Sequence, residues 1–142
     1  MSDELAAANV NRSYQLAASS IAIFTFSMFF LFPKFASGEV GAWPFHATLI
    51  VMGLATFSFA FASFYYYGAS LGARVDDAAR AKYARRGDLF WLLGCVSLFL
   101  APSLILFTVK LLAVAALWFA LWLVYLFSVM RHFPRVQAGG KG

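Results

Sequence analysis

The sequence predicts an all-α polytopic membrane protein with four transmembrane helices in two hairpins. Of its 142 residues, 63% are hydrophobic and 12% are charged, about half of the roughly 25% charged residues of soluble domains. Residues 89–130 carry a single formal charge, Lys110, near their middle. Because about 20 helical residues cross the ~30 Å hydrocarbon core, this stretch predicts two crossings joined by a tight turn. Two further apolar stretches lie upstream and predict a second, looser hairpin.

The first crossing is expected over residues 14–32, which contain no charge. It follows a polar, alanine-rich segment, residues 1–13, that suits a frayed or interfacial helix. A cleavable signal is not expected, because the chain starts with acidic residues and its first apolar block is long and late. Pro33 removes a backbone donor and Lys34 can reach the headgroups, so both are expected to end this crossing.

The second crossing is expected over residues 46–67, after a polar connection that contains glycines, Pro44 and the interfacial candidate Trp43. Small residues recur at helical spacing along one face of this segment. Membrane helices associate by close backbone approach, so such a face predicts a helix–helix contact. The residues of this predicted contact are Ala55, Ser58, Ala62 and Ala69.

Residues 68–88 are expected to form a basic cytoplasmic loop. Within it, residues 76–86 are rich in helix formers, with aspartates at the start and arginines at the end, as the helix dipole favours. We expect a short helix that stops at Gly87 and either lies on the membrane or continues the second crossing. Its basic residues are candidates for contact with anionic lipid. These candidates are Arg74, Arg80, Lys82, Arg85 and Arg86.

The third and fourth crossings are expected over residues 89–106 and 112–130. Pro102 predicts a kink or an early end in the third, where the Ser103 hydroxyl could bond to a freed backbone group. The turn is expected between residues 103 and 110, although no glycine marks it. Residues 133–142 are expected to form a flexible tail.

The distribution of basic residues predicts that both termini are cytoplasmic. Nine of the 11 lysines and arginines precede the first crossing, lie between the second and third, or follow the fourth. Only Lys34 and Lys110 fall on the other side. This bias predicts the N-in, C-in topology of a bacterial inner membrane protein. It also explains the net charge of +5 without a nucleic-acid partner.

No crossing contains Asp or Glu, which argues against a proton-coupled carrier. The small multidrug-resistance transporters have this length and helix count, but they depend on a glutamate in their first helix, which residues 14–32 lack. Lys110 is expected at a turn, where a charge costs little, with a buried functional lysine as the alternative.

Neither a metal nor a cofactor is expected from the remaining candidates. Cys95 is a lone cysteine in an apolar run without metal-ligand spacing around it. His46 and His132 are expected on opposite sides of the membrane and cannot bind one metal together.

Three aromatic residues share a face of the fourth crossing: Trp118, Trp122 and Tyr125. Tryptophan favours the membrane interface, so two tryptophans near mid-membrane require a reason. One interpretation is packing, against the small residues of the second crossing or a partner subunit. The other is an aromatic wall that binds a lipophilic ligand, such as a quinone or a lipid tail.

A second small face on the fourth crossing could pack internally or meet another subunit. It contains Ala113, Ala116 and Ala120. We therefore favour a non-enzymatic membrane subunit that self-associates or joins other membrane subunits. A contribution to solute permeation is one role that such a subunit could have. A lipophilic-ligand binder is the second hypothesis. A small membrane enzyme is the third, because no nucleophile, carboxylate pair or metal cluster is evident.

Overall fold

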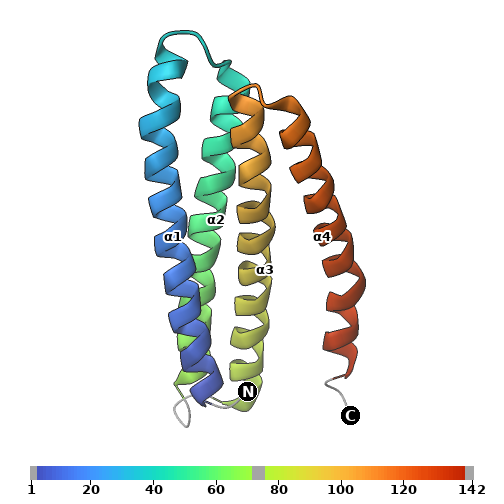
Figure 1. The fold of residues 1–142 in the computed structure, drawn as a ribbon. Coiled ribbons are helices and arrows are strands. Elements are labelled where there is room, and N and C mark those ends of the chain that lie inside the picture. The colour runs from blue at the N-terminus through green and yellow to red at the C-terminus, as the bar shows by residue number, and fades with distance from the viewer. Residues whose placement is uncertain (1–2, 72–75, 140–142) are drawn as a thin grey trace.

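A computed structural model describes the backbone of residues 3–71 and 76–139, and the side chains of residues 4–71 and 76–131. Within these ranges the chain forms four helices, each long and apolar enough to span a membrane, which confirms the predicted helical class. They are α1 (Asp3–Ala36), α2 (Ala42–Ser70), α3 (Asp77–Thr108) and α4 (Leu112–Gly139). Figure 1 shows the α1–α2 and α3–α4 connections at one end, the turn end. The start of α1 and the end of α4 lie at the other, the terminal end.

The helices are longer than the predicted crossings. Helices of 28 to 34 residues are about 42–51 Å long at ~1.5 Å per residue, against a hydrocarbon core of ~30 Å. The α1 helix begins at Asp3 and continues through Pro33, which costs it only one backbone donor close to its end. The backbone of α4 continues to Gly139, into the segment for which the sequence predicts a flexible tail.

The α3 helix differs most from the sequence-based expectation. Helix begins at Asp77 and runs without interruption into the third crossing and through Pro102. Gly87 is therefore not a helix stop. It is buried under the ring of Tyr66, and a Cβ atom at this position would lie 2.8 Å from a ring carbon. The predicted basic loop is thus helical from Asp77 onward, and its helix continues the third crossing rather than the second.

The α1–α2 turn uses a glycine to end its helix. Gly38 has a φ of +79°, and its N–H donates to the carbonyl of Phe35 at 3.0 Å. The N–H of Glu39 donates to the carbonyl of Lys34 at 2.9 Å. These two bonds form a Schellman motif, in which a left-handed residue satisfies the last carbonyls of the helix.

The α3–α4 turn repeats this motif with lysine in place of glycine. Lys110 has a φ of +64°, and its N–H donates to Phe107 at 3.0 Å. The N–H of Leu111 donates to Leu106 at 2.9 Å. The left-handed conformation explains how the chain reverses where no glycine signals a turn. It also places Lys110 at the helix end, as expected, and not inside a crossing.

The contact between α2 and α3 is a seam with heptad spacing. Phe59 covers Gly94, and Tyr66 covers Gly87 one heptad away on both helices. Continued by one heptad toward the turn end, the same register pairs Met52 of α2 with Ala101 of α3. All these residues are buried. Glycine and alanine let the two backbones approach closely, and a heptad repeat keeps the seam together along a left-handed supercoil.

The α1 helix packs on the other side of α2 and also uses small residues at heptad spacing. The Ser20 hydroxyl donates to the carbonyl of Leu16 in its own helix at 2.8 Å. Among the described residues, the buried hydroxyls of Ser13 and Ser63 have no hydrogen-bond partner. The buried heptad positions of α1 are Ala6, Ser13, Ser20 and Ser27.

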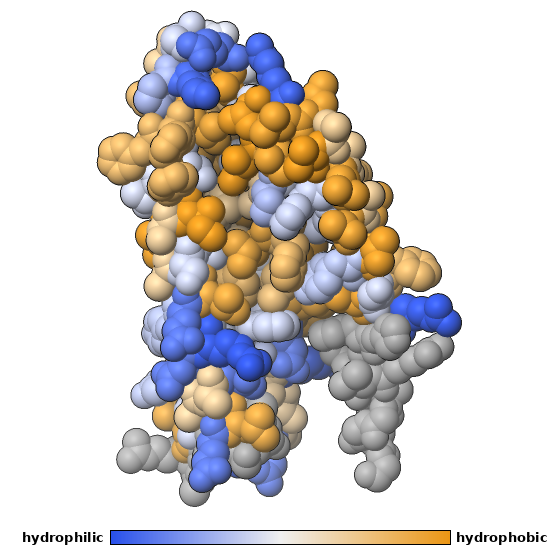
Figure 2. Space-filling model, viewed as in Figure 1, coloured by the Kyte–Doolittle hydropathy of each residue, from blue (hydrophilic) through white to orange (hydrophobic). Residues whose placement is uncertain are grey.

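The α4 helix is the least covered of the four. In the most apolar 18-residue window of α2, 39% of residues are buried, whereas the corresponding window of α4 has 6%. Extensive contacts of α4 are made with α3 alone, and Figure 1 shows the two diverging toward the terminal end. In Figure 2, hydrophobic residues cover the middle of the helices and hydrophilic residues gather near both ends. This distribution matches a bilayer around the middle of the bundle.

Candidate functional site

Three polar side chains join α3 to α4. Trp118 donates its indole N–H to the carbonyl of Phe99 at 3.2 Å, and Trp122 donates to Val96 at 2.9 Å. The Ser103 hydroxyl donates in the opposite direction, to the carbonyl of Ala115 at 3.0 Å. An indole N–H within hydrocarbon needs an acceptor, and both tryptophans have one in these carbonyls.

Tyr125 connects α4 to the buried centre of the bundle. Its ring centroid lies 4.9 Å from that of Phe99. It also packs against a cluster formed by Ala17, Ala55, Phe59 and Cys95, which come from the other three helices. The lone cysteine is therefore a packing residue between helices.

The two tryptophans of the predicted aromatic face thus bond to α3, while Tyr125 packs against the cluster that includes Ala55 of α2. Both indole N–H groups are engaged by backbone carbonyls, and Trp118 remains 40% exposed. Binding of a lipophilic ligand at this face stays a prediction. A ligand there would meet ring surfaces, because the polar atoms of the tryptophans already have partners.

The two predicted small faces have opposite environments. The α2 residues Ala55, Ser58, Ala62 and Ala69 are all buried inside the bundle. The α4 residues Ala113, Ala116 and Ala120 are all exposed, whereas Ala115 of the same helix is buried. The two small faces therefore do not pack on each other.

Heptad spacing defines two stripes of residues on α4. The inner stripe faces α3 and consists of Ala115, Trp118, Trp122, Tyr125 and Val129. The outer stripe has the same heptad spacing, and every member is exposed. At about 100° per residue, the two-residue offset between the stripes places them nearly opposite each other. The outer stripe consists of Ala113, Ala116, Ala120, Leu123, Phe127 and Met130.

Four basic residues of the 68–88 segment, Arg80, Lys82, Arg85 and Arg86, lie along the first turns of α3. Arg80 donates from Nε to the carbonyl of Ala69 at 3.3 Å, and its Nη1 lies 3.7 Å from a carboxylate oxygen of Asp77. The guanidinium of Arg86 lies 5.8 Å from the centroid of the Tyr65 ring. Lys82 and Arg85 are exposed, and Arg74 lies outside the described residues. Contact of this set with anionic lipid stays a prediction.

A buried tyrosine and an exposed aspartate close the α2–α3 seam near the terminal end. The Tyr66 hydroxyl donates to a carboxylate oxygen of Asp88 at 2.7 Å. Gly87 leaves room for the Tyr66 ring, so the glycine and the aspartate position the same side chain. Gly87 and Gly94 were not predicted as contact residues, although their seven-residue spacing, continued by Ala101, is visible in the sequence.

Neither histidine belongs to a metal cluster in the described part of the chain. His46 is exposed at the turn end, with its ring 5.7 Å from those of Phe35 and Phe45. The side chain of His132 lies outside the described residues. Within the described ranges, no three His, Cys, Asp or Glu residues are grouped so that they could hold a metal ion.

These features define an α-helical protein with four candidate membrane spans, organised around α2 and α3. Comparisons with protein-family models, curated proteins and solved structures find no match.

Proposed function

We propose that this protein is a non-enzymatic subunit of the bacterial cytoplasmic membrane that self-associates through the outer stripe of α4. The observation that carries this proposal is the exposure of three alanines, Ala113, Ala116 and Ala120, at heptad spacing on the face of α4 opposite the one that packs on α3. Lipid tolerates exposed leucine and phenylalanine, so these residues alone favour no partner. Small residues at heptad spacing permit close helix approach, which favours a second helix at this position.

Charge supports an arrangement in two antiparallel hairpins with both termini in the cytoplasm. Lys34 and Lys110 lie together at the turn end, where they line one cavity. Arg80, Lys82 and Arg86 belong to the opposite end of α3, beyond the third crossing. Since basic residues are retained on the cytoplasmic side, the turn end is the outer end in this proposal.

Replacing Ala116 by leucine tests the association. A bulkier residue in a close helix contact costs about 1–3 kcal/mol, so we expect the dissociation constant of the oligomer to rise at least about fivefold. The measurement is the mass distribution in mild detergent over a range of protein concentrations. Ala60→Leu is the matched control, because Ala60 is an exposed alanine on α2.

The control variant should associate like the unchanged protein. A monomeric unchanged protein, or equal association of both variants, would contradict self-association through α4. Ala62 cannot serve in this test, because it is fully buried in the bundle and a larger residue there would disturb folding.

A further inference from the structure

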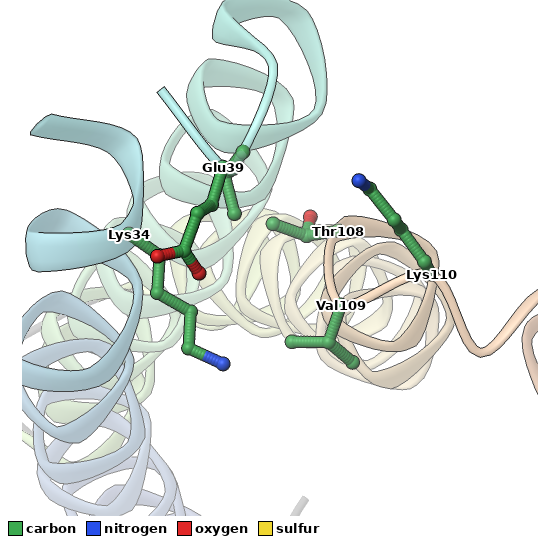
Figure 3. A pocket seen from close by; sticks show the side chains of 6 residues that line it. Lys34, Glu39, Thr108, Val109 and Lys110 are labelled. Carbon is green, nitrogen blue, oxygen red and sulfur yellow. The ribbon is translucent and has the colours of Figure 1, made fainter. Parts of the chain in front are cut away.

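We propose that a cavity at the turn end binds a phosphate group that carries an ammonium, the chemistry of a phosphoethanolamine headgroup. The cavity has a volume of about 180 Å³ and lies between the α1–α2 turn and the last residues of α3. Figure 3 shows Lys34 and Glu39 on one side and Lys110 on the other, with Thr108 and Val109 between them. Two lysines and one glutamate therefore line a single space.

The three charged side chains are available for a ligand. Among the residues that the structure describes, Lys34, Glu39 and Lys110 form no side-chain hydrogen bond or ion pair with one another or with another group. All three are exposed. Because these opposite charges do not pair with each other, they can bind a zwitterionic ligand. The lysines can bind its anionic group and Glu39 its cationic group.

Hydrogen bonds hold the backbone around the cavity in place, whereas the charged side chains form none with the described residues. On one side, the N–H groups of Glu39 and Val40 both donate to the carbonyl of Lys34, at 2.9 and 3.1 Å. On the other, the Thr108 hydroxyl donates to the carbonyl of Leu104 at 2.7 Å. The Schellman motif that follows determines the direction of Lys110. The Cα atoms of the charged residues are therefore held in place before a ligand arrives, which lowers the entropic cost of binding.

Lys110 is an uncommon choice for its backbone position. The left-handed conformation is unfavourable for an ordinary residue, whereas glycine adopts it without this cost. Here the ammonium of Lys110 completes the charged set around the cavity.

The composition of the set selects the ligand class. Two lysines suit a phosphate, while Glu39 would repel a purely anionic headgroup and attract an ammonium that can donate hydrogen bonds. Val40 and Val109 contribute apolar surface to the same cavity. Trp43 lies at this end and is 69% exposed. Its ring is edge-on to that of Phe107, with the two ring centroids 6.2 Å apart. An exposed tryptophan is typical of the headgroup level of a bilayer.

The test measures which lipids the purified protein retains from nanodiscs containing phosphatidylethanolamine, phosphatidylcholine and phosphatidylglycerol in equal amounts. Exposed charge pairs contribute about 0.2–1 kcal/mol, so retention of phosphatidylethanolamine should exceed that of phosphatidylcholine by about 1.5- to fivefold. The trimethylated ammonium of phosphatidylcholine cannot donate to Glu39. A separate arm titrates free phosphoethanolamine against protein in detergent and distinguishes a soluble ligand from a membrane lipid.

Two variants test which residue binds the ammonium and which binds the phosphate. Glu39→Gln should remove the preference for phosphatidylethanolamine over phosphatidylcholine and raise the retention of phosphatidylglycerol, because the carboxylate that repels an anionic headgroup is gone. Lys110→Gln should lower retention of both phosphatidylethanolamine and phosphatidylglycerol. Lys82→Gln, an exposed lysine far from the turn end of α3, is the control and should change neither. The proposal is overturned if Glu39→Gln keeps the preference, or if Lys110→Gln and Lys82→Gln behave alike.

Discussion

Gly94→Ala is expected to lower the free energy of unfolding by about 1–3 kcal/mol, because it overpacks the seam between α2 and α3. A Cβ atom at position 94 would lie 2.8 Å from a ring carbon of Phe59. Phe59 is itself fully buried and cannot swing into lipid. The backbones of α2 and α3 must therefore separate, or the ring must leave its preferred position. Unfolding in mixed detergent micelles, followed by a spectroscopic signal, measures the loss.

The matched control for this change is Gly53→Ala. Gly53 lies in α2, and a Cβ atom there would meet nothing within 4 Å. This variant should be neutral or slightly stabilising, since alanine is the better helix former. Phe59→Leu should reduce the effect of Gly94→Ala when the two are combined. Equal stability of Gly94→Ala and Gly53→Ala would show that the two helices are not held by this close contact.

Replacing both Trp118 and Trp122 by phenylalanine is expected to cost about 1–3 kcal/mol of unfolding free energy. Each indole donates to a carbonyl of α3, at 3.2 and 2.9 Å. Hydrogen bonds between membrane helices average ~0.6 kcal/mol and reach ~1.7 kcal/mol. Phenylalanine keeps a ring but cannot donate, so the change isolates the polar part of the α3–α4 contact.

The control for the tryptophan pair is Trp43→Phe at the turn end, which should change the unfolding free energy little because its indole is 69% exposed. The account of the α3–α4 contact fails if the double variant is as stable as this control. Such a result would return the two tryptophans to the ligand hypothesis, which needs their rings but not their hydrogen bonds to α3.

Composition and charge were sufficient to predict the number of spans. About 20 helical residues cross the hydrocarbon core, so the lengths of the apolar stretches predict four spans. The same length places Lys110 at the turn between the third and the fourth span. The small residues of α2 that the sequence singles out are all buried in the bundle, and three of them, Ala55, Ala62 and Ala69, are spaced seven residues apart.

The role of a glycine could not be predicted from the sequence, because glycine is used both at helix ends and at close helix contacts. Gly87 is followed by an apolar stretch and preceded by arginines, which is the pattern of a helix end, yet it is a packing position inside α3. The partner of α4 could not be predicted either. Both α2 and α3 carry small residues, and the choice of α3 depends on which carbonyls the tryptophans of α4 can reach.

The topology is tested most directly by cysteine labelling from each side of the membrane. Cys95→Ala removes the single native cysteine, and Ser37→Cys or Ala81→Cys is then introduced at an exposed position near the turn end or the start of α3. A membrane-impermeant maleimide should label Ser37→Cys in intact spheroplasts, and Ala81→Cys only after permeabilisation. Labelling of both positions in intact spheroplasts, or the reverse pattern, would contradict a four-span bundle with cytoplasmic termini.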